Sequence, residues 1–437
     1  MNFESIIRAG KADGATPSNR FVVGNFSKST PGVSQGGAPS ASEAAKVNTP
    51  DVSPEKFIAV YIHLPFCAVK CPFCDFYTRP NRHAEEAKAY TSALISEIKN
   101  YRAFGWSKPL RMTSIYFGGG TPSLTSTKDL ESILRALRDE FEWDPHLEMT
   151  IEANPEDVTQ EKAGRWKDLG INRVSLGVQA LSDDDLKQLG RKGTAENNHL
   201  AWQILKKTAF KCLSVDLMFG LRNQTRDAWK ETLQAILPWN AEHLSCYNLT
   251  IESKTRYWVD INQGKWVPPS DEIQADMFLE ARKTLAQHGF KHYEISNYAK
   301  VGYESLHNSA YWNGQNYWGI GVAAHSLQRT QSTIRRFWKP KSLQTYVQKI
   351  HQLSHVIQDE LLSPEKHLRE RTMLCLRTSK GVHLASLAND LECEIPKDLV
   401  EMLERFKNEG FIEKQQENLI LTAKGQLFSD SLFEAFV

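Results

Sequence analysis

The 437-residue sequence lacks an excess of either charge, since 53 Lys and Arg residues stand against 52 Asp and Glu, a formal net charge of +1. Nucleic-acid-binding proteins usually gather a basic excess on one face, so no nucleic-acid partner is expected. No run of about 18 apolar residues is present, so no membrane span is expected. The N-terminus also lacks the basic and then apolar pattern of a secretory signal, which predicts a cytoplasmic protein.

Cysteine is scarce and unevenly distributed. Three of the seven cysteines, Cys67, Cys71 and Cys74, fall within eight positions. The others are scattered, at Cys212, Cys246, Cys375 and Cys393. In a reducing compartment, an odd number with one cluster indicates a metal site plus structural thiols, not a disulfide framework.

Residues 1–55 have a composition of their own, rich in Gly, Ser, Ala, Pro and Thr. Such a stretch cannot bury enough apolar area to offset its ordering entropy, so we predict a disordered N-terminal extension. An organelle-targeting peptide is the weaker alternative, because Glu4, Asp13 and Glu43 make the segment less acid-poor than such peptides are.

From Phe57 onward, short β-branched or aromatic runs alternate with longer amphipathic stretches. Strands are predicted over 57–64, 114–119, 147–153, 173–179, 213–220 and 243–250, and helices near 83–104, 127–142, 159–169, 194–208 and 225–237. This alternation predicts an α/β core of about six βα units over residues 56–290, with a parallel sheet covered by helices. An open doubly wound sheet and a full or partial barrel both fit, and both gather functional residues at the C-terminal ends of the strands.

Two further regions follow the βα repeat. Residues 291–362 are dense in aromatic side chains and contain HNSAYWNGQNYWGIG. Residues 363–437 have a helical pattern that ends in a predicted β-hairpin, which indicates a small α+β, winged-helix-like domain. Winged helices often bind DNA, but without a strongly basic helix we expect this one to pack against its neighbour.

The segment YIHLPFCAVKCPFCDFY places the three clustered cysteines at C-x3-C-x2-C, directly after a predicted strand. Thiolates are the usual ligands of iron–sulfur clusters, and short spacings let one loop wrap a single cube. Three cysteines leave one of four irons open for another ligand. A structural zinc site that uses His63 or a distant cysteine is the alternative, but zinc ligands normally come in pairs and no second pair is present.

This motif resembles the radical S-adenosylmethionine (SAM) signature, and residues 57–437 resemble the anaerobic coproporphyrinogen III dehydrogenase family. The resemblance implies a partial (βα)6 barrel and a [4Fe–4S] cluster on Cys67, Cys71 and Cys74. It implies that the open iron binds the methionine end of SAM. An electron donor such as flavodoxin or ferredoxin would reduce the cluster, and SAM cleavage would release a 5′-deoxyadenosyl radical.

The resemblance also implies a set of SAM-contacting residues, several of them in FGGGTPS, IEANPE and LGVQ. These residues are Tyr61, Phe73, Gly119, Gly120, Thr121, Glu152, Gln179, Arg191 and Asp216. Glycines allow close approach to a ligand, and a carboxylate at a strand's C-terminal end is better placed for a ligand than for packing. Asp216 lies in an apolar run, where an unpaired carboxylate is costly, so a buried salt bridge or helix cap is its alternative role.

Two features distinguish members of this family. The dehydrogenase pattern continues to a fourth cysteine, where this sequence has Phe76, and HNSAYW at 307–312 resembles the HNxxYW motif of the HemW haem chaperones. A neutral imidazole commonly ligates haem iron. His307 is therefore the candidate axial ligand, in a haem motif with Asn308, Tyr311 and Trp312. Structural core filling is the alternative role for these residues, and His325 and Cys246 are alternative ligands.

Two functions remain open at this stage. The first is a haem chaperone that transfers haem to acceptor proteins such as respiratory cytochromes, with transient contact with membrane haem proteins. The second is an oxygen-independent decarboxylase that turns coproporphyrinogen III into protoporphyrinogen IX in porphyrin biosynthesis. Phe76 and HNSAYW favour the chaperone, in which SAM cleavage is plausible and dehydrogenase activity doubtful.

Overall fold

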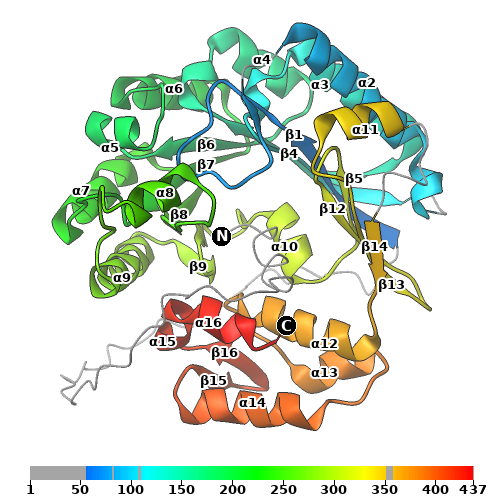
Figure 1. Ribbon diagram of the computed structural model, residues 1–437, viewed down its shortest axis with the longest axis vertical. Helices are drawn as coiled ribbons and strands as arrows, with labels where there is room; N and C mark the ends of the chain where they lie inside the picture. Colours follow the sequence, from blue (N-terminus) through cyan, green and yellow to red (C-terminus); the bar gives the residue numbers. More distant parts are fainter. Residues whose placement is uncertain (1–55, 81–82, 107–109, 351–357, 437) are drawn as a thin grey trace, which may run out of the picture.

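The protein is described from a computed structural model, which covers residues 56–80, 83–106, 110–350 and 358–436 (Figure 1). The extension predicted over residues 1–55 lies outside these described residues. Within them, no helix combines the length and the hydropathy that crossing a bilayer requires.

Six parallel strands form the centre of a curved sheet. They are β1 (Phe57–Leu64), β4 (Arg111–Gly119), β5 (Glu142–Ala153), β6 (Arg173–Gln179), β7 (Cys212–Phe219) and β8 (His243–Asn248). Their neighbours in the sheet follow their order in the sequence, as expected for successive βα units. The strands predicted over 57–64 and 173–179 match β1 and β6 residue for residue.

Helices cover the outer face of these strands (Figure 1). They are α2 (Ala84–Lys99), α3 (Thr127–Glu140), α4 (Gln160–Asp168), α6 (Ala195–Thr208), α7 (Arg226–Ile236) and α9 (Asp271–Gln287). Helices α5 (Asp183–Gln188) and α8 (Arg256–Asn262) instead pack together near Phe73 of the cysteine segment. Most of the helices begin after a Ser or Thr whose side chain accepts a hydrogen bond from the third helical amide, as Ser126 does from Asp129 and Thr225 from Ala228. The helix predicted over 83–104 ends earlier, at Lys99, and a separate 3-10 turn covers Tyr101–Phe104.

The sheet continues on both sides of the six parallel strands. Across the described residues it has twelve strands in the order β14-β13-β12-β11-β1-β4-β5-β6-β7-β8-β10-β9. The added strands are β9 (Lys291–Glu294), β10 (Asn297–Ala299), β11 (Tyr317–Ile320), β12 (His325–Arg329), β13 (Ile334–Trp338) and β14 (Gln358–Leu361). Since β9 and β14 form opposite edges, the sheet is a partial barrel and not a closed one.

The aromatic-rich segment 291–362 is part of this same sheet. Strand β11 runs parallel to β1, with Val60 opposite Trp318, and β12 to β14 follow it as antiparallel strands. Helix α10 (Leu306–Trp312) lies inside the open barrel against β4 and β1, and α11 (Leu343–Lys349) lies near α2 (Figure 1). The HNSAYW motif thus forms a helix that faces the inner side of the sheet.

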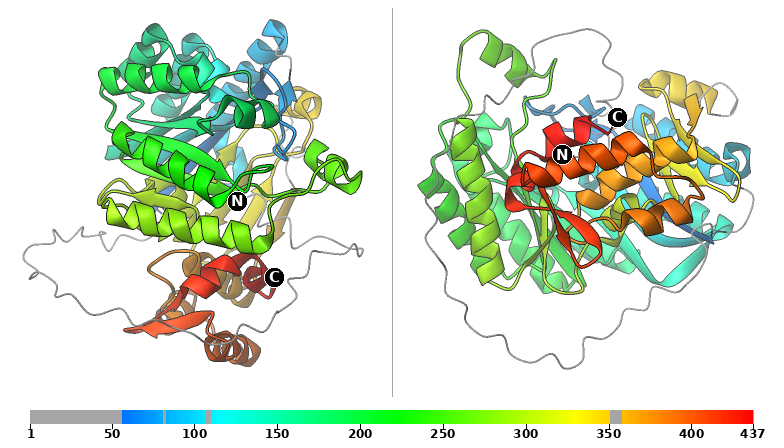
Figure 2. Two further views of the ribbon diagram at one scale, coloured as in Figure 1. Left: turned by 90° about the vertical axis from the view of Figure 1, so that its left-hand side faces the viewer. Right: turned by 90° about the horizontal axis from the view of Figure 1, so that it is seen from below.

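A small α+β unit lies across the open side of the barrel, below the edge strands β9 and β14 (Figures 1 and 2). It contains α12 (Pro364–Leu376), α13 (Leu384–Asp390), α14 (Lys397–Asn408), the hairpin of β15 (Ile412–Gln415) and β16 (Asn418–Leu421), α15 (Ala423–Leu427) and α16 (Ser429–Glu434). Its hydrophobic core includes Trp312 of α10. The predicted hairpin and helices are present, and the unit packs against the barrel.

Candidate functional site

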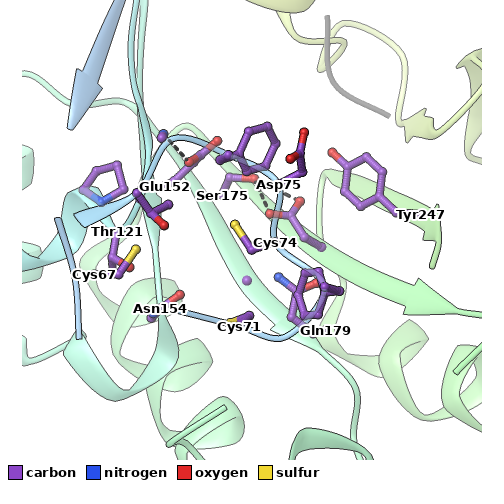
Figure 3. Close-up of a pocket in the computed structure, with 18 of the residues that line it drawn as sticks. Cys67, Cys71, Cys74, Asp75, Thr121, Glu152, Asn154, Ser175, Gln179 and Tyr247 are labelled. Carbon is purple, nitrogen blue, oxygen red and sulfur yellow. Dashed lines mark hydrogen bonds between the residues drawn. The ribbon is translucent and has the colours of Figure 1, made fainter. Parts of the chain in front are cut away.

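A cavity of about 410 Å³ lies at the C-terminal ends of the parallel strands (Figure 3). This volume is in the range of small-molecule binding sites. Every site residue predicted from the sequence lines it: Tyr61, Cys67, Cys71, Phe73, Cys74, Gly119, Gly120, Thr121, Glu152, Gln179, Arg191, Asp216, His307, Asn308, Tyr311 and Trp312. The C-x3-C-x2-C loop and the HNSAYW helix, far apart in the sequence, therefore share one cavity.

The cysteine loop crosses the mouth of this cavity between two short paired strands, β2 (Phe66–Cys67) and β3 (Arg79–Pro80). The Cys74 amide donates to the Cys71 carbonyl at 3.1 Å, which curls the loop around the cavity side. All seven cysteines are free thiols. In Figure 3 the sulfurs of Cys67, Cys71 and Cys74 lie along one side of the cavity, as a set of ligands from a single loop requires.

Burial dominates the electrostatic surroundings of these three thiols. Burial raises the pKa of all three, that of Cys74 to about 12, while a hydrogen bond from Thr121 lowers that of Cys67 and the Arg191 charge lowers that of Cys71. In the described part of the chain, no three His, Cys, Asp or Glu side chains converge on a single metal ion. The cysteines of an iron–sulfur cube bind separate irons, so their sulfurs need not converge.

The glycine segment packs directly against the cysteine loop. The Gly120 amide donates to the Leu64 carbonyl at 2.8 Å, and the Thr121 amide donates to the Phe66 carbonyl at 2.9 Å. A Cβ at Gly120 would stand 2.5 Å from the Pro65 carbonyl oxygen, so only glycine permits this approach. The close approach joins the glycine segment to the cluster loop and brings both to one wall.

Two carboxylates lie deeper in the cavity. Glu152 accepts hydrogen bonds from the Tyr116 hydroxyl at 2.9 Å and the Gly119 amide at 3.2 Å, and Asp216 accepts from the Ser175 hydroxyl at 3.0 Å. Burial raises the pKa of Glu152 to about 7 and that of Asp216 to about 6. Among the described residues neither carboxylate has an ion-pair partner, so a cationic ligand group would fit beside them. Within the described chain, the salt bridge considered for Asp216 is not formed, and the hydroxyls of Ser175 and Ser245 hydrogen-bond its carboxylate instead.

The remaining residues predicted to contact SAM line other sides of the cavity. Arg191 donates to the Asn154 side-chain oxygen at 2.7 Å and to the Gly177 carbonyl at 3.0 Å. Gln179 ends β6 with a φ of 66°, an unusual conformation for a residue other than glycine, which often marks a functional constraint. Phe73 packs near Tyr257 of α8, with ring centroids 6.3 Å apart.

Tyr61 connects the SAM side of the cavity to the haem motif. Its hydroxyl hydrogen-bonds the His63 Nδ1 atom at 3.1 Å, and its ring lies 6.3 Å from the ring of His307. His63 also bonds the Tyr77 carbonyl through Nε2 at 2.9 Å. These two hydrogen bonds hold His63 behind the cysteine loop. It does not line the cavity, as a metal ligand would.

The haem motif is held rigidly by its neighbours. His307 is 1% exposed; its Nδ1 atom lies 2.9 Å from the Ser114 hydroxyl and its Nε2 atom 2.9 Å from the Tyr311 hydroxyl. Burial lowers the pKa of His307 to about 3, so the imidazole is neutral. Of the alternative ligands, His325 also lines the cavity, whereas Cys246 is buried in the hydrophobic core.

Several cavity residues were not predicted from the sequence, including Tyr116, Asn154, Ser175, Tyr247 and Arg377. The sequences of the strands did contain a signal for some of these cavity residues. Polar residues recur at every second position, as Ser114 and Tyr116 do in β4, which is the period of one face of a strand. Arg377 comes from the C-terminal unit, far from any motif, and no local signal marks it.

Comparisons with known proteins match two regions of the chain to described families. Residues 61–236 match the radical SAM superfamily, and residues 362–428 match the HemN C-terminal domain. The chain is 30% identical over 379 residues to the haem chaperone HemW of Lactococcus lactis, covering 87% of this chain and 97% of that protein. It is 33% identical to HemW of Synechocystis, covering 86% and 90% of the two chains.

A mouse relative, the mitochondrial radical S-adenosyl methionine domain-containing protein 1, is 35% identical over 275 residues, 63% of this chain and 62% of that one. The solved structure of coproporphyrinogen III oxidase (HemN) from Escherichia coli has a TM-score of 0.75 at 21% identity, covering 88% and 91% of the two chains. The similarity to that structure shows that the two chains share a fold.

Fold, cysteine loop and superfamily match together define a radical SAM protein, with a [4Fe–4S] cluster and SAM as its cofactors. Within that class, identity over nearly the full length of the curated relatives decides the family. The chain belongs to the HemW family.

Proposed function

We propose that this protein is a haem chaperone that binds haem and a SAM-coordinated [4Fe–4S] cluster and transfers haem to acceptor proteins. The observation that carries the proposal is the shared cavity, because the C-x3-C-x2-C loop and the HNSAYW helix line the same space. A site that joins the two motifs can couple the state of the cluster to the haem.

The residues present fit the cluster and SAM. Cys67, Cys71 and Cys74 would bind three irons, and the carboxylate of Glu152 would accept a hydrogen bond from the amino group of the SAM methionine. When bound, the reduced cluster supplies an electron for cleavage of SAM. The chain itself positions SAM and shields the site.

The residues of the HNSAYW helix also fit haem as cargo. Tyr311, Trp312 and Tyr317 offer apolar ring surface around the lower part of the cavity, and Arg377 lies over the Trp312 ring at 4.6 Å. Aromatic side chains can cover an apolar macrocycle. The haem site therefore comprises His307, Asn308, Tyr311 and Trp312 with these neighbours.

The proposal also includes an electron donor, haem acceptors and a cellular compartment. Lys70 and Lys192 are exposed at the rim of the cavity, where a small acidic protein of the flavodoxin or ferredoxin class would approach the cluster. The acceptors are haem proteins such as respiratory cytochromes, reached through transient contact with membrane haem proteins. The chaperone itself works in the cytoplasm.

One reconstituted sample tests the function. Anaerobic loading with iron and sulfide is followed by haem titration, by a SAM-cleavage assay and by incubation with a haem-free cytochrome. A stable Soret band and transfer of haem to the cytochrome are expected. If the Soret band or the haem transfer is not observed, the chaperone proposal fails.

The residue at position 76 distinguishes the haem chaperone from the second candidate function, the coproporphyrinogen III decarboxylase. Phe76 lines the cavity where the dehydrogenase pattern has its fourth cysteine, so the wild-type protein should form no protoporphyrinogen from coproporphyrinogen III. Repeated turnover under anaerobic reducing conditions would establish the decarboxylase instead. Inactivity of Phe76→Cys would carry no weight, since substrate positioning needs more than one residue.

A further inference from the structure

His307 lines the cavity, but both nitrogens of its ring are engaged in hydrogen bonds. Nδ1 is bonded to the Ser114 hydroxyl and Nε2 to the Tyr311 hydroxyl, both at 2.9 Å, and the side chain is buried. The ring also stacks on Tyr116, with centroids 4.9 Å apart and planes 25° apart. To ligate iron, His307 would have to break one hydrogen bond and leave the stack.

Tyr311 occupies the position next to the cavity. Its side chain is half-buried and lines the cavity, and its hydroxyl is held by His307. Its ring is fixed edge-on against Tyr317, with centroids 4.7 Å apart and planes at 80°. Phenolate oxygen is a known proximal ligand of haem iron.

We propose that Tyr311 is the axial ligand of ferric haem in this protein and that His307 is a positioning residue that holds the Tyr311 oxygen. The inference rests on the proposed haem binding and assigns the iron ligand within that site. In the ligation step the iron–oxygen bond forms, the phenol O–H bond breaks and one proton leaves to solvent, while the iron stays ferric.

Ser114 makes this step compatible with a buried imidazole. A hydroxyl can either accept a hydrogen bond from Nδ1–H or donate one to a bare Nδ1. His307 can therefore present the Nε2 lone pair to the phenol of Tyr311 or an Nε2–H to its phenolate. The ring stays neutral in both arrangements, which matters because full burial penalises an imidazolium.

The molecule contains a second Ser–His–Tyr set away from the cavity. The His243 Nδ1 atom lies 2.7 Å from the Ser214 hydroxyl, and its Nε2 atom lies 2.9 Å from the Tyr293 hydroxyl. Tyr293 also accepts from the Ser305 amide at 3.3 Å, and neither it nor His243 lines the cavity. Tyr293→Phe is therefore a matched control. It removes a tyrosine hydroxyl from a Ser–His–Tyr set and leaves Tyr311, the proposed ligand, unchanged.

The test is titration of the full chain with ferric haem, read by absorption and by resonance Raman spectroscopy for an iron–phenolate band. The wild type and Tyr293→Phe should both show the band. Tyr311→Phe should lose it and bind haem at least tenfold more weakly. Tyr311→His should replace it with an imidazole-type spectrum, which reports that position 311 faces the iron.

His307 variants test the positioning role. His307→Ala should keep the phenolate band but shift it and weaken binding severalfold, and His307→Gln, whose amide can still bond the hydroxyl, should lie closer to wild type. An imidazole-type wild-type spectrum that His307→Ala abolishes and Tyr311→Phe keeps would overturn the ligand assignment alone. A wild-type protein that binds no haem would overturn the chaperone function as well.

Discussion

The seven cysteines differ in their surroundings, and this decides which of them matter for iron. Cys67, Cys71 and Cys74 line the cavity, whereas Cys212 is buried beside the β-sheet core and Cys393 belongs to the C-terminal unit. Their chemistry is the same, so only position separates them.

Replacing any one of the three cavity cysteines with Ala should abolish the broad charge-transfer absorption of the cluster. Wild-type protein should hold about four irons per chain after anaerobic reconstitution, because three thiolates and SAM saturate one cube. Cys393→Ser is the matched control and should keep the full iron content. A reconstituted triple variant that still carries four irons would contradict the assignment.

The carboxyl of Glu152 makes the stability of the cluster-free protein depend on pH. Burial raises its pKa from 4.5 to about 7, so between these values the folded chain holds a proton that the unfolded chain has lost. The free energy of unfolding should therefore fall as pH rises from 4.5 to 7, by about 2 kcal/mol for a side chain that faces an open cavity.

Glu152→Gln should remove this fall, so the cluster-free variant should be more stable than wild type at pH 8. Urea unfolding of both proteins at pH 5 and pH 8 measures the difference. Glu161→Gln, an exposed glutamate on α4, should follow the wild-type curve. Parallel pH dependence in wild type and Glu152→Gln would show that another group is responsible.

At the scale of elements, one buried carboxylate ties the start of helix α10 to the barrel. Glu148 of β5 accepts hydrogen bonds from the His307 amide at 3.0 Å and from the Ser305 hydroxyl at 3.3 Å. It also pairs with Arg173 of β6 at 3.5 Å, and both side chains are buried. Glu148 of β5 therefore joins β6 to the start of α10.

Glu148→Ala should lower the free energy of unfolding by about 3–5 kcal/mol, because it leaves the Arg173 charge buried without its partner. Haem affinity should fall with it, since the start of α10 loses its acceptor. Glu142→Ala on the same strand removes an exposed pair with Arg111 and should change stability by less than about 1 kcal/mol. Equal losses in the two variants, measured by urea unfolding, would refute this account.

At the scale of the whole molecule, a buried ion pair joins the C-terminal unit to the barrel. Arg377 pairs with Glu294 at 2.7 Å, with the two side chains 2% and 0% exposed, and its guanidinium lies over the Trp312 ring. Since Arg377 also lines the cavity, docking of the C-terminal unit completes the floor of the site.

Arg377→Ala should destabilise the protein by about 3–5 kcal/mol and loosen the C-terminal unit, because Glu294 is left buried and unpaired. Limited proteolysis should then cut near the start of α12 faster than in wild type. Arg369→Ala breaks an exposed pair with Asp398 and should leave the digestion pattern unchanged. Identical digestion of Arg377→Ala and wild type would mean that apolar packing alone holds the unit.

The sequence by itself determined the features that short segments encode. The C-x3-C-x2-C spacing indicates the cluster loop because all three ligands lie on one loop, and the βα rhythm predicts strands such as β1 and β6 to the residue. Ser and Thr caps mark most helix starts for the same local reason. The superfamily is indicated by these patterns, and the family by HNSAYW together with Phe76.

Only the tertiary structure decided what each side chain meets. Ser114 and His307 are 193 residues apart, and Glu148 and His307 are 159 apart, so no local pattern could pair them. The inner strand faces carry polar residues because α10 and the cavity occupy the barrel, a context that the apolar character of the strands conceals. The imidazole that looks like an iron ligand in the motif is, once folded, enclosed by a serine and a tyrosine, because packing across the barrel fixes its hydrogen bonds.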